Sequence, residues 1–256
     1  MSIDLSKLLP TKDIQPPRIV LYGPPKIGKT TFAASIPNNL IIDAEGGSGA
    51  AKVARIKKEE LPNFSSLIGV LTDLYTQQHT FTAVTLDSID WIEQLIFDAA
   101  AQEHGKTSIA DVGYGAGYST AQNLWKQLLE GLDALRKDKG IMPVMIAHEQ
   151  VKIYNNPLGD NYDRYSLKLR SSDKGSSSES IIKEWSDLIG FINKETFVRK
   201  EKNGLKETKK AATSDRVFIY TRESPAYLAG NRYNLPDQLP FSWEVLSEAL
   251  IKGMAS

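Results

Sequence analysis

The segment at residues 18–31 decides the fold, and it reads RIVLYGPPKIGKTT. Its first five residues are mostly apolar, which is typical of a buried strand, and its last residues open a helical segment that runs to Ser35. A glycine-rich turn lies between the two. Because successive backbone N–H groups in such a turn lie at the positive end of a helix dipole, the segment predicts a site for a phosphate group.

The spacing Gly-x4-Gly-Lys-Thr from Gly23 to Thr30 is that of the phosphate-binding loop, or P-loop, which holds a nucleoside triphosphate. We expect Lys29 to reach the β- and γ-phosphates, as a catalytic group, and Thr30 to bind Mg²⁺. A glycine turn with an incidental lysine is the alternative. The predicted ligands are ATP and Mg²⁺. The predicted nucleotide-binding residues are Gly23, Pro24, Pro25, Lys26, Ile27, Gly28, Lys29, Thr30 and Thr31.

Composition excludes several other classes of protein. The chain has 256 residues, 41% of them hydrophobic, which is enough for one substantial core, so we expect a short N-terminal arm at 1–17 and a single domain at 18–256. Lys and Arg total 31, as do Asp and Glu, and there is no cysteine. No segment approaches the ~18 apolar residues of a membrane span. We therefore expect a cytoplasmic protein without disulfides or a membrane partner.

Apolar runs alternate with helical patterns along the chain, and the runs are continuously apolar. This predicts an α/β fold with a mainly parallel central sheet and helices on both faces. Further strands are expected at 40–43, 83–87 and 142–147, and helices at 64–75, 89–104 and 120–137. Strands at 185–199 and 216–221, with a hairpin-type Asn203-Gly204 between them, predict antiparallel additions at the C-terminal side, and a helix is expected at 241–254.

Asp87 stands at the end of an apolar strand, where a carboxylate can bind Mg²⁺ through water. The alternative is a cap for the helix that follows. Ligands of parallel α/β sheets bind at the carboxyl ends of the strands, which favours the metal role.

Hydrolysis also needs a group that orients or deprotonates water. Glu45 lies two residues beyond the strand at 40–43 and could do so from the neighbouring strand end, although Asp43 competes for this role. Both carboxylates could instead cap or solvate a loop. His148 follows the strand at 142–147 and could hydrogen-bond the γ-phosphate, or it could be an ordinary satisfied side chain.

In order and spacing, these motifs resemble the RecA-type ATPase core. Residues 220–236, which read YTRESPAYLAGNRYNLP, resemble the closing motif of phage-encoded nucleotide-binding proteins, a group that includes core-only RecA-like single-strand annealing recombinases. The resemblance covers residues 17 to 245. In that family the residue before Asn-Arg-Tyr is commonly lysine, whereas this chain has Gly230.

The resemblance implies a homo-oligomer, a ring or a filament, with ATP between subunits and a basic group supplied by the neighbour. Because the lysine is missing, Arg232 is the candidate for this catalytic group, with Arg222 behind it, and structural salt bridges are the alternative for both. The resemblance also implies that Glu45 is the catalytic base and that the protein acts in the cytoplasm of the phage host.

Two irregular segments, 105–119 and 151–180, fall where RecA-like proteins place their DNA-binding loops. Residues 150–174 contain five Lys or Arg against three Asp, a net charge of +2, with three interleaved tyrosines, a pattern that suits single-stranded nucleic acid. Residues 194–210 contain seven basic against three acidic residues, a net charge of +4. Solvated surfaces are the alternative. Tyr114 and Tyr118 could likewise stack on bases or pack their loop.

Three functions compete at this stage. The first is an ATPase that binds single-stranded DNA and promotes annealing or strand pairing in recombination. The second is a small-molecule kinase, which lacks an evident arginine-rich lid. The third is a nucleotide-switched adaptor that loads a replication or packaging protein and hydrolyses ATP slowly.

Overall fold

The structure is a computed structural model that describes residues 14–47, 52–172, 177–203 and 206–255. Most of the N-terminal arm expected at 1–17 therefore lies outside the described residues, as does Gly204 of the expected hairpin turn.

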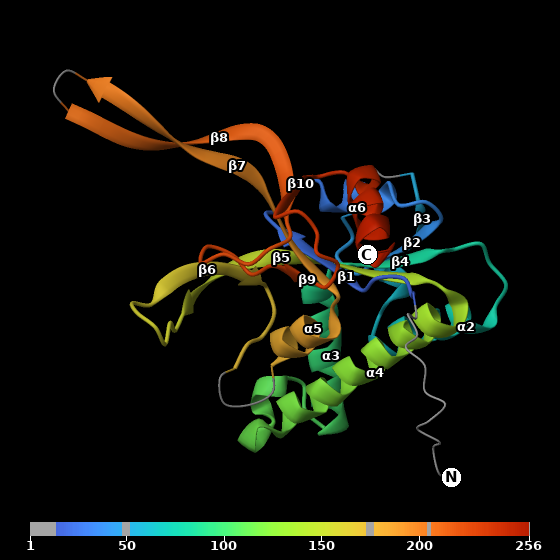
Figure 1. Cartoon of the computed structure of the whole chain (residues 1–256). Helices are drawn as coiled ribbons and strands as arrows, with labels where there is room; N and C mark the ends of the chain where they lie inside the picture. Colours follow the sequence, from blue (N-terminus) through green and yellow to red (C-terminus); the bar gives the residue numbers. More distant parts are fainter. Residues whose placement is uncertain (1–13, 48–51, 173–176, 204–205, 256) are drawn as a thin grey trace, which may run out of the picture.

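A single mixed sheet forms the centre of the chain, in the order β10-β8-β7-β1-β5-β4-β2-β3. The strands from β7 to β3 in this order run parallel, while β8 and β10 add antiparallel strands beyond β7 (Figure 1). Two short additions are antiparallel as well: β6 pairs with β5, and β9 pairs with β7. The strands are β1 (Ile19–Gly23), β2 (Asn39–Asp43), β3 (Ala54–Ile56), β4 (Ala83–Asp87), β5 (Met142–Tyr154), β6 (Tyr162–Leu167), β7 (Leu188–Asn203), β8 (Lys206–Tyr220), β9 (Gly230–Asn231) and β10 (Gln238–Pro240).

Helices cover both faces of the sheet (Figure 1). Both faces of β1 are apolar and need to be covered: Val20 and Tyr22 belong to one buried apolar cluster, and Ile19 and Leu21 belong to another. The first cluster includes α2, α3, α4 and α5, and the second includes α1 and α6. The main helices are α1 (Lys29–Ala34), α2 (Phe64–Thr76), α3 (Ile89–Glu103), α4 (Ala116–Lys139), α5 (Ser178–Trp185) and α6 (Trp243–Ala255). The predicted fold class, with helices on both faces and antiparallel strands on the C-terminal side, is confirmed.

The prediction of an irregular segment at 151–180 is wrong. Strand β5 continues to Tyr154 and forms a hairpin with β6, so the Asn- and Gly-rich residues occupy only the turn between them. The serine-rich part that follows contains the start of a helix, because the side chain of Ser177 accepts a hydrogen bond from the N–H of Ser180 and caps α5. The strand expected from residue 185 begins later than predicted, because Trp185 is the last residue of α5 and β7 begins at Leu188.

The segment at 105–119 contains more helix than expected. Two 3-10 turns, Ile109–Asp111 and Gly113–Gly115, lead into α4, which begins at Ala116 rather than at the predicted residue 120. Its two tyrosines differ in environment. Tyr114 is fully exposed, whereas the guanidinium of Arg170 lies 3.7 Å from the ring centre of Tyr118.

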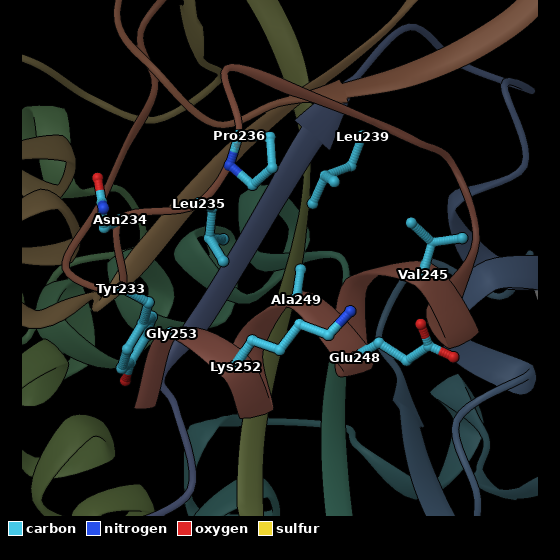
Figure 2. A pocket seen from close by; sticks show the side chains of 10 residues that line it. All are labelled: Tyr233, Asn234, Leu235, Pro236, Leu239, Val245, Glu248, Ala249, Lys252 and Gly253. Atoms are coloured by element: carbon cyan, nitrogen blue, oxygen red, sulfur yellow. The ribbon is translucent and has the colours of Figure 1, made fainter. Parts of the chain in front are cut away.

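The closing segment 220–236 returns along the sheet and packs against α6. Asn231 organises it: the side-chain oxygen accepts hydrogen bonds from the N–H groups of Tyr233 and Leu235, and the amide donates to the carbonyl of Thr221, each at 3.0 Å. A mainly apolar groove of about 360 Å³ remains between this segment and α6 (Figure 2). The residues of the Asn-Arg-Tyr motif thus serve the fold itself.

A cluster of opposite charges joins the elements at the amino ends of the parallel strands. Asp187, just before β7, is 5% exposed and accepts hydrogen bonds from Arg18, just before β1, at 2.9–3.1 Å. Arg232 lies 3.1 Å from the same carboxylate, and Arg136 of α4 lies 3.7 Å from it. Burial alone would raise the pKa of Asp187, but the hydrogen bonds and charge of Arg18 outweigh burial and lower it.

We expect Asp187→Asn to reduce the free energy of unfolding by about 3 kcal/mol at pH 7, because it removes the buried carboxylate shared by Arg18, Arg136 and Arg232, and the first two of these side chains are less than a fifth exposed. Since the pKa of Asp187 is lowered by folding, its stabilisation is complete above its unfolded pKa of about 3.9 and is lost as the pH falls through the folded value. Urea unfolding of both proteins between pH 7 and pH 3 measures this difference, which should shrink in acid.

The control is Asp237→Asn, which removes an exposed partner of Arg222 and should change stability by about 0.5 kcal/mol. An equal effect of the two substitutions would contradict the role assigned to Asp187.

Candidate nucleotide-binding site

The P-loop joins β1 to α1 in the way that the sequence predicts. Two positions of the loop require glycine, one for its backbone conformation and one for the close approach of a neighbouring strand. Gly28 precedes α1 with a φ of 104°, a left-handed conformation that side chains disfavour. A Cβ atom at Gly23 would overlap the carbonyl oxygen of Ile192 in the neighbouring β7. The loop therefore lies close against the sheet, with the amino end of α1 at its far side.

Lys29 is held inside this loop. Its side chain is almost fully buried, at 7% exposed, and the ammonium donates hydrogen bonds to the carbonyls of Gly23 and Pro24, each at 2.8 Å. Burial lowers the pKa of Lys29, and nearby carboxylates oppose that shift. The cation is thus placed among the backbone groups that would surround a phosphate.

Thr30 and Asp87 meet, although 57 residues separate them. The hydroxyl of Thr30 donates a hydrogen bond of 2.7 Å to Asp87 Oδ2, which lies at the carboxyl end of β4. Burial is the main reason that the pKa of Asp87 is raised to about 6, and the charges of Glu45 and Asp43 add to it, while Thr30 and Lys29 oppose it. The structure therefore brings together the two residues predicted to hold Mg²⁺.

The residues present fit a magnesium nucleotide better than a metal held by protein alone. Within the described ranges, no group of three or more His, Cys, Asp or Glu side chains could hold a metal ion. Mg²⁺ commonly binds through one or two protein oxygens, several waters and the phosphates of its substrate. Thr30 and Asp87 supply that small number of protein oxygens.

Asp43 and Glu45, the competing candidates for the water-activating group, have different environments. Asp43 is buried, and its Oδ1 accepts hydrogen bonds from the N–H groups of Gly46 and Gly47 at 2.7 and 3.2 Å, so it shapes the turn after β2. Glu45 has a side chain that is 36% exposed, and its Oε2 lies 3.8 Å from His148 Nε2. This arrangement favours Glu45 over Asp43, and its role in hydrolysis stays a prediction.

His148 lies between two carboxylates. Its Nδ1 is 3.0 Å and 3.2 Å from the two oxygens of Asp90, and its backbone N–H donates to Asp90 Oδ1 at 3.1 Å. The hydrogen bond to Asp90 is the main reason that the pKa of His148 is raised. Asp90, in the first turn of α3, is a site residue that the sequence analysis missed, because an acidic residue there is also what any helix favours.

Arg232 and Arg222 do not lie at this chain's P-loop site. Arg232 belongs to the Asp187 cluster at the opposite ends of the strands, and Arg222 pairs with Asp237 at 3.1 Å. These pairs correspond to the structural alternative considered for both arginines. A contribution from a neighbouring subunit stays a prediction.

The fold and the site define a P-loop nucleotide-binding protein. A family model described as an AAA domain matches residues 15–233, which is most of the chain, and the chain therefore belongs to this family. Membership implies nucleotide binding and ATPase activity, typically with Mg²⁺. Comparison with curated proteins gave no match. None of the helices in the described ranges is both long and apolar enough to cross a membrane.

We expect Asp87→Asn to stabilise the nucleotide-free protein and to impair metal binding. At pH 7 the buried carboxylate is mostly ionised, and because folding raises its pKa to about 6, its charge lowers the free energy of unfolding by roughly 3 kcal/mol. This penalty disappears as the pH falls from about 6 towards 4, so the variant should lose its advantage there. Urea unfolding and nucleotide titration with and without Mg²⁺ measure both effects; a variant whose nucleotide affinity keeps its full dependence on Mg²⁺ would contradict the metal role.

Proposed function

We propose that this protein is a phage-encoded ATPase that binds single-stranded DNA and promotes annealing or strand pairing in recombination, in the cytoplasm of the host. The observation that carries the proposal is the course of β5. This strand carries His148 at the nucleotide site and continues six residues further to Tyr154, in the β5–β6 hairpin. The nucleotide site and the hairpin thus share one strand.

The β5–β6 hairpin has the side chains expected of a surface for single-stranded nucleic acid. The rings of Tyr154 and Tyr162 stack with their centres 5.1 Å apart, and the guanidinium of Arg164 lies 5.2 Å from the ring centre of Tyr154. Such aromatic platforms bind bases of any sequence by stacking. The hairpin extends beyond the edge of the helical layer, where a strand of DNA could reach it (Figure 1).

A pocket of about 680 Å³ with a mixed polar and apolar lining lies beside this platform. Its lining includes the basic residues Lys152, Arg164 and Lys183 against one carboxylate, that of Glu179, which pairs with Lys152. Arg164 is buried, and its Nη2 pairs with Glu223 and donates to the carbonyl of Tyr227 at 3.2 Å. Its Nε has no hydrogen-bond partner among the described residues, and this one nitrogen supports the binding of a phosphate in the pocket.

The proposal includes a homo-oligomer, a ring or a filament, with ATP between subunits. Arg222 and Arg232 are both more than half exposed and each contacts one carboxylate, so either could re-pair with a phosphate on a neighbouring subunit. Loop 105–119, with its exposed Tyr114, is proposed as a second DNA contact.

Lys29→Ala and Glu45→Gln separate binding from turnover. We expect Lys29→Ala to lose nucleotide binding, because it removes the cation within the loop, and Glu45→Gln to keep binding while the turnover rate falls by about 10²- to 10⁴-fold. Nucleotide titration and ATPase assays with and without single-stranded DNA measure this. DNA should stimulate the wild type, and equal loss of binding in both variants would rule out the role of Glu45.

Tyr154→Ala tests the DNA surface. Loss of one stacked base should weaken single-stranded DNA binding about tenfold at constant salt, and nucleotide binding should remain unchanged. Tyr75→Ala is a matched control, since Tyr75 and Tyr154 are both 39% exposed but Tyr75 lies on α2. Fluorescence anisotropy of labelled DNA measures the affinities, and equal losses in the two variants would contradict a specific role of Tyr154.

The second candidate is a nucleotide-switched adaptor that loads a replication or packaging protein and hydrolyses ATP slowly. The β7–β8 hairpin favours it, because its paired backbone runs to Asn203 and Lys206, far beyond the sheet, and offers a ribbon for a protein partner (Figure 1). Slow hydrolysis that DNA leaves unchanged, together with a stable complex with a second protein, would support the adaptor over the recombination function.

A further inference from the structure

Glu149 occupies a position at the nucleotide site to which the sequence analysis gave no role. In the pairing of β1 with β5, the Cα of Gly23 lies opposite that of His148, so Glu149 stands one residue further, beside the start of the P-loop. Successive side chains of a strand lie on opposite faces, so Glu149 faces away from the side where His148 meets Asp90. Both residues nevertheless stand at the carboxyl end of the β1–β5 pairing, next to the P-loop.

The charge of Glu149 acts on the P-loop lysine. Although burial lowers the pKa of Lys29 overall, Glu149 raises it more than any other charge, ahead of Asp87 and Glu45. The Lys29 ammonium itself is bonded to the carbonyls of Gly23 and Pro24. Glu149 is therefore close enough to influence the region that the γ-phosphate would occupy.

One carboxylate oxygen of Glu149 lacks a hydrogen-bond donor among the described residues. Oε2 is buried and has no hydrogen-bond partner among the residues that the structure describes. Leaving a buried acceptor unpaired costs roughly 1–3 kcal/mol, more for a charged group, so a partner that arrives with the substrate would be favoured. That partner is not the γ-phosphate, because an ionised carboxylate and a phosphate oxygen are both acceptors and repel each other. A water molecule donates to both.

We propose that Glu149 is a second catalytic carboxylate, whose Oε2 accepts a hydrogen bond from the water that attacks the γ-phosphorus of ATP. The water oxygen forms a bond to phosphorus while the bond from phosphorus to the β–γ bridging oxygen breaks, which yields ADP and inorganic phosphate, and the proton released by the water passes to Glu45. Glu149 fixes the direction of attack, and Glu45 takes the proton. This inference rests on the proposed ATP hydrolysis but not on DNA binding.

The test is Glu149→Gln, which keeps the shape of the side chain and removes its charge. The turnover rate should fall about 10- to 100-fold while the KM for ATP stays the same or decreases. Binding gives a second readout that needs no turnover: affinity for ATP should rise several-fold relative to affinity for ADP, because the removed charge lies near the γ-phosphate and Lys29. Titration with ATP and ADP at low temperature, before hydrolysis proceeds, gives this ratio.

The matched control is Glu103→Gln, the same substitution at an exposed position at the end of α3, which should change neither quantity. An unchanged turnover rate in Glu149→Gln would overturn the proposal, and so would an equal fall in ATP and ADP affinity, which indicates a structural role. If the wild type hydrolysed no ATP, the proposed function would fail, while the ratio of ATP to ADP affinity would still test whether Glu149 faces the γ-phosphate.

Discussion

The hydrogen bond between Thr30 and Asp87 is the contact on which the nucleotide site depends. It joins the helix after β1 to the end of β4, although β5 lies between these two strands in the sheet. The contact is possible because parallel strands have their carboxyl ends on the same side of the sheet. The residues that follow β1, β2, β4 and β5 therefore lie near one another. Glu45 after β2 and His148 and Glu149 on β5 reach the same edge for the same reason. The chemistry of the site follows from the order of the strands.

Ionised side chains affect stability in opposite ways at the two ends of the parallel strands. At the amino ends, folding lowers the pKa of Asp187 because arginines surround it, so its ionised form stabilises the fold. At the carboxyl ends, burial raises the pKa of Asp87 and lowers that of Lys29, so the charged forms of both groups oppose folding. A protein can keep such unfavourable charges where they serve a ligand, provided that other contacts hold the fold together. The Asp187 cluster and the apolar layers on both faces do so here.

The parts of the structure that the sequence predicts are those governed by local patterns. The P-loop, the apolar strand that ends at Asp87 and the position of Glu45 after β2 depend on short motifs and on the shared edge of a parallel sheet. The β5–β6 hairpin was missed because β5 continues beyond its buried residues with exposed apolar side chains, Val151 and Ile153, and because the polar turn resembles a loop. Asp90 was missed because its contact with His148 joins residues 58 apart through the pairing of β4 with β5. Such contacts exist only once the sheet has its order.

The accumulation of carboxylates around Lys29 constrains how the site can work. The charges of Glu45 and Asp43 raise the pKa of Asp87. Glu149, Asp87 and Glu45 all act on Lys29. A triphosphate brings several more negative charges to this place, so backbone N–H groups and Lys29 alone would leave it strongly repelled. Mg²⁺ held by Thr30 and Asp87 would offset this repulsion and would also neutralise the buried carboxylate. Metal and nucleotide should therefore bind cooperatively.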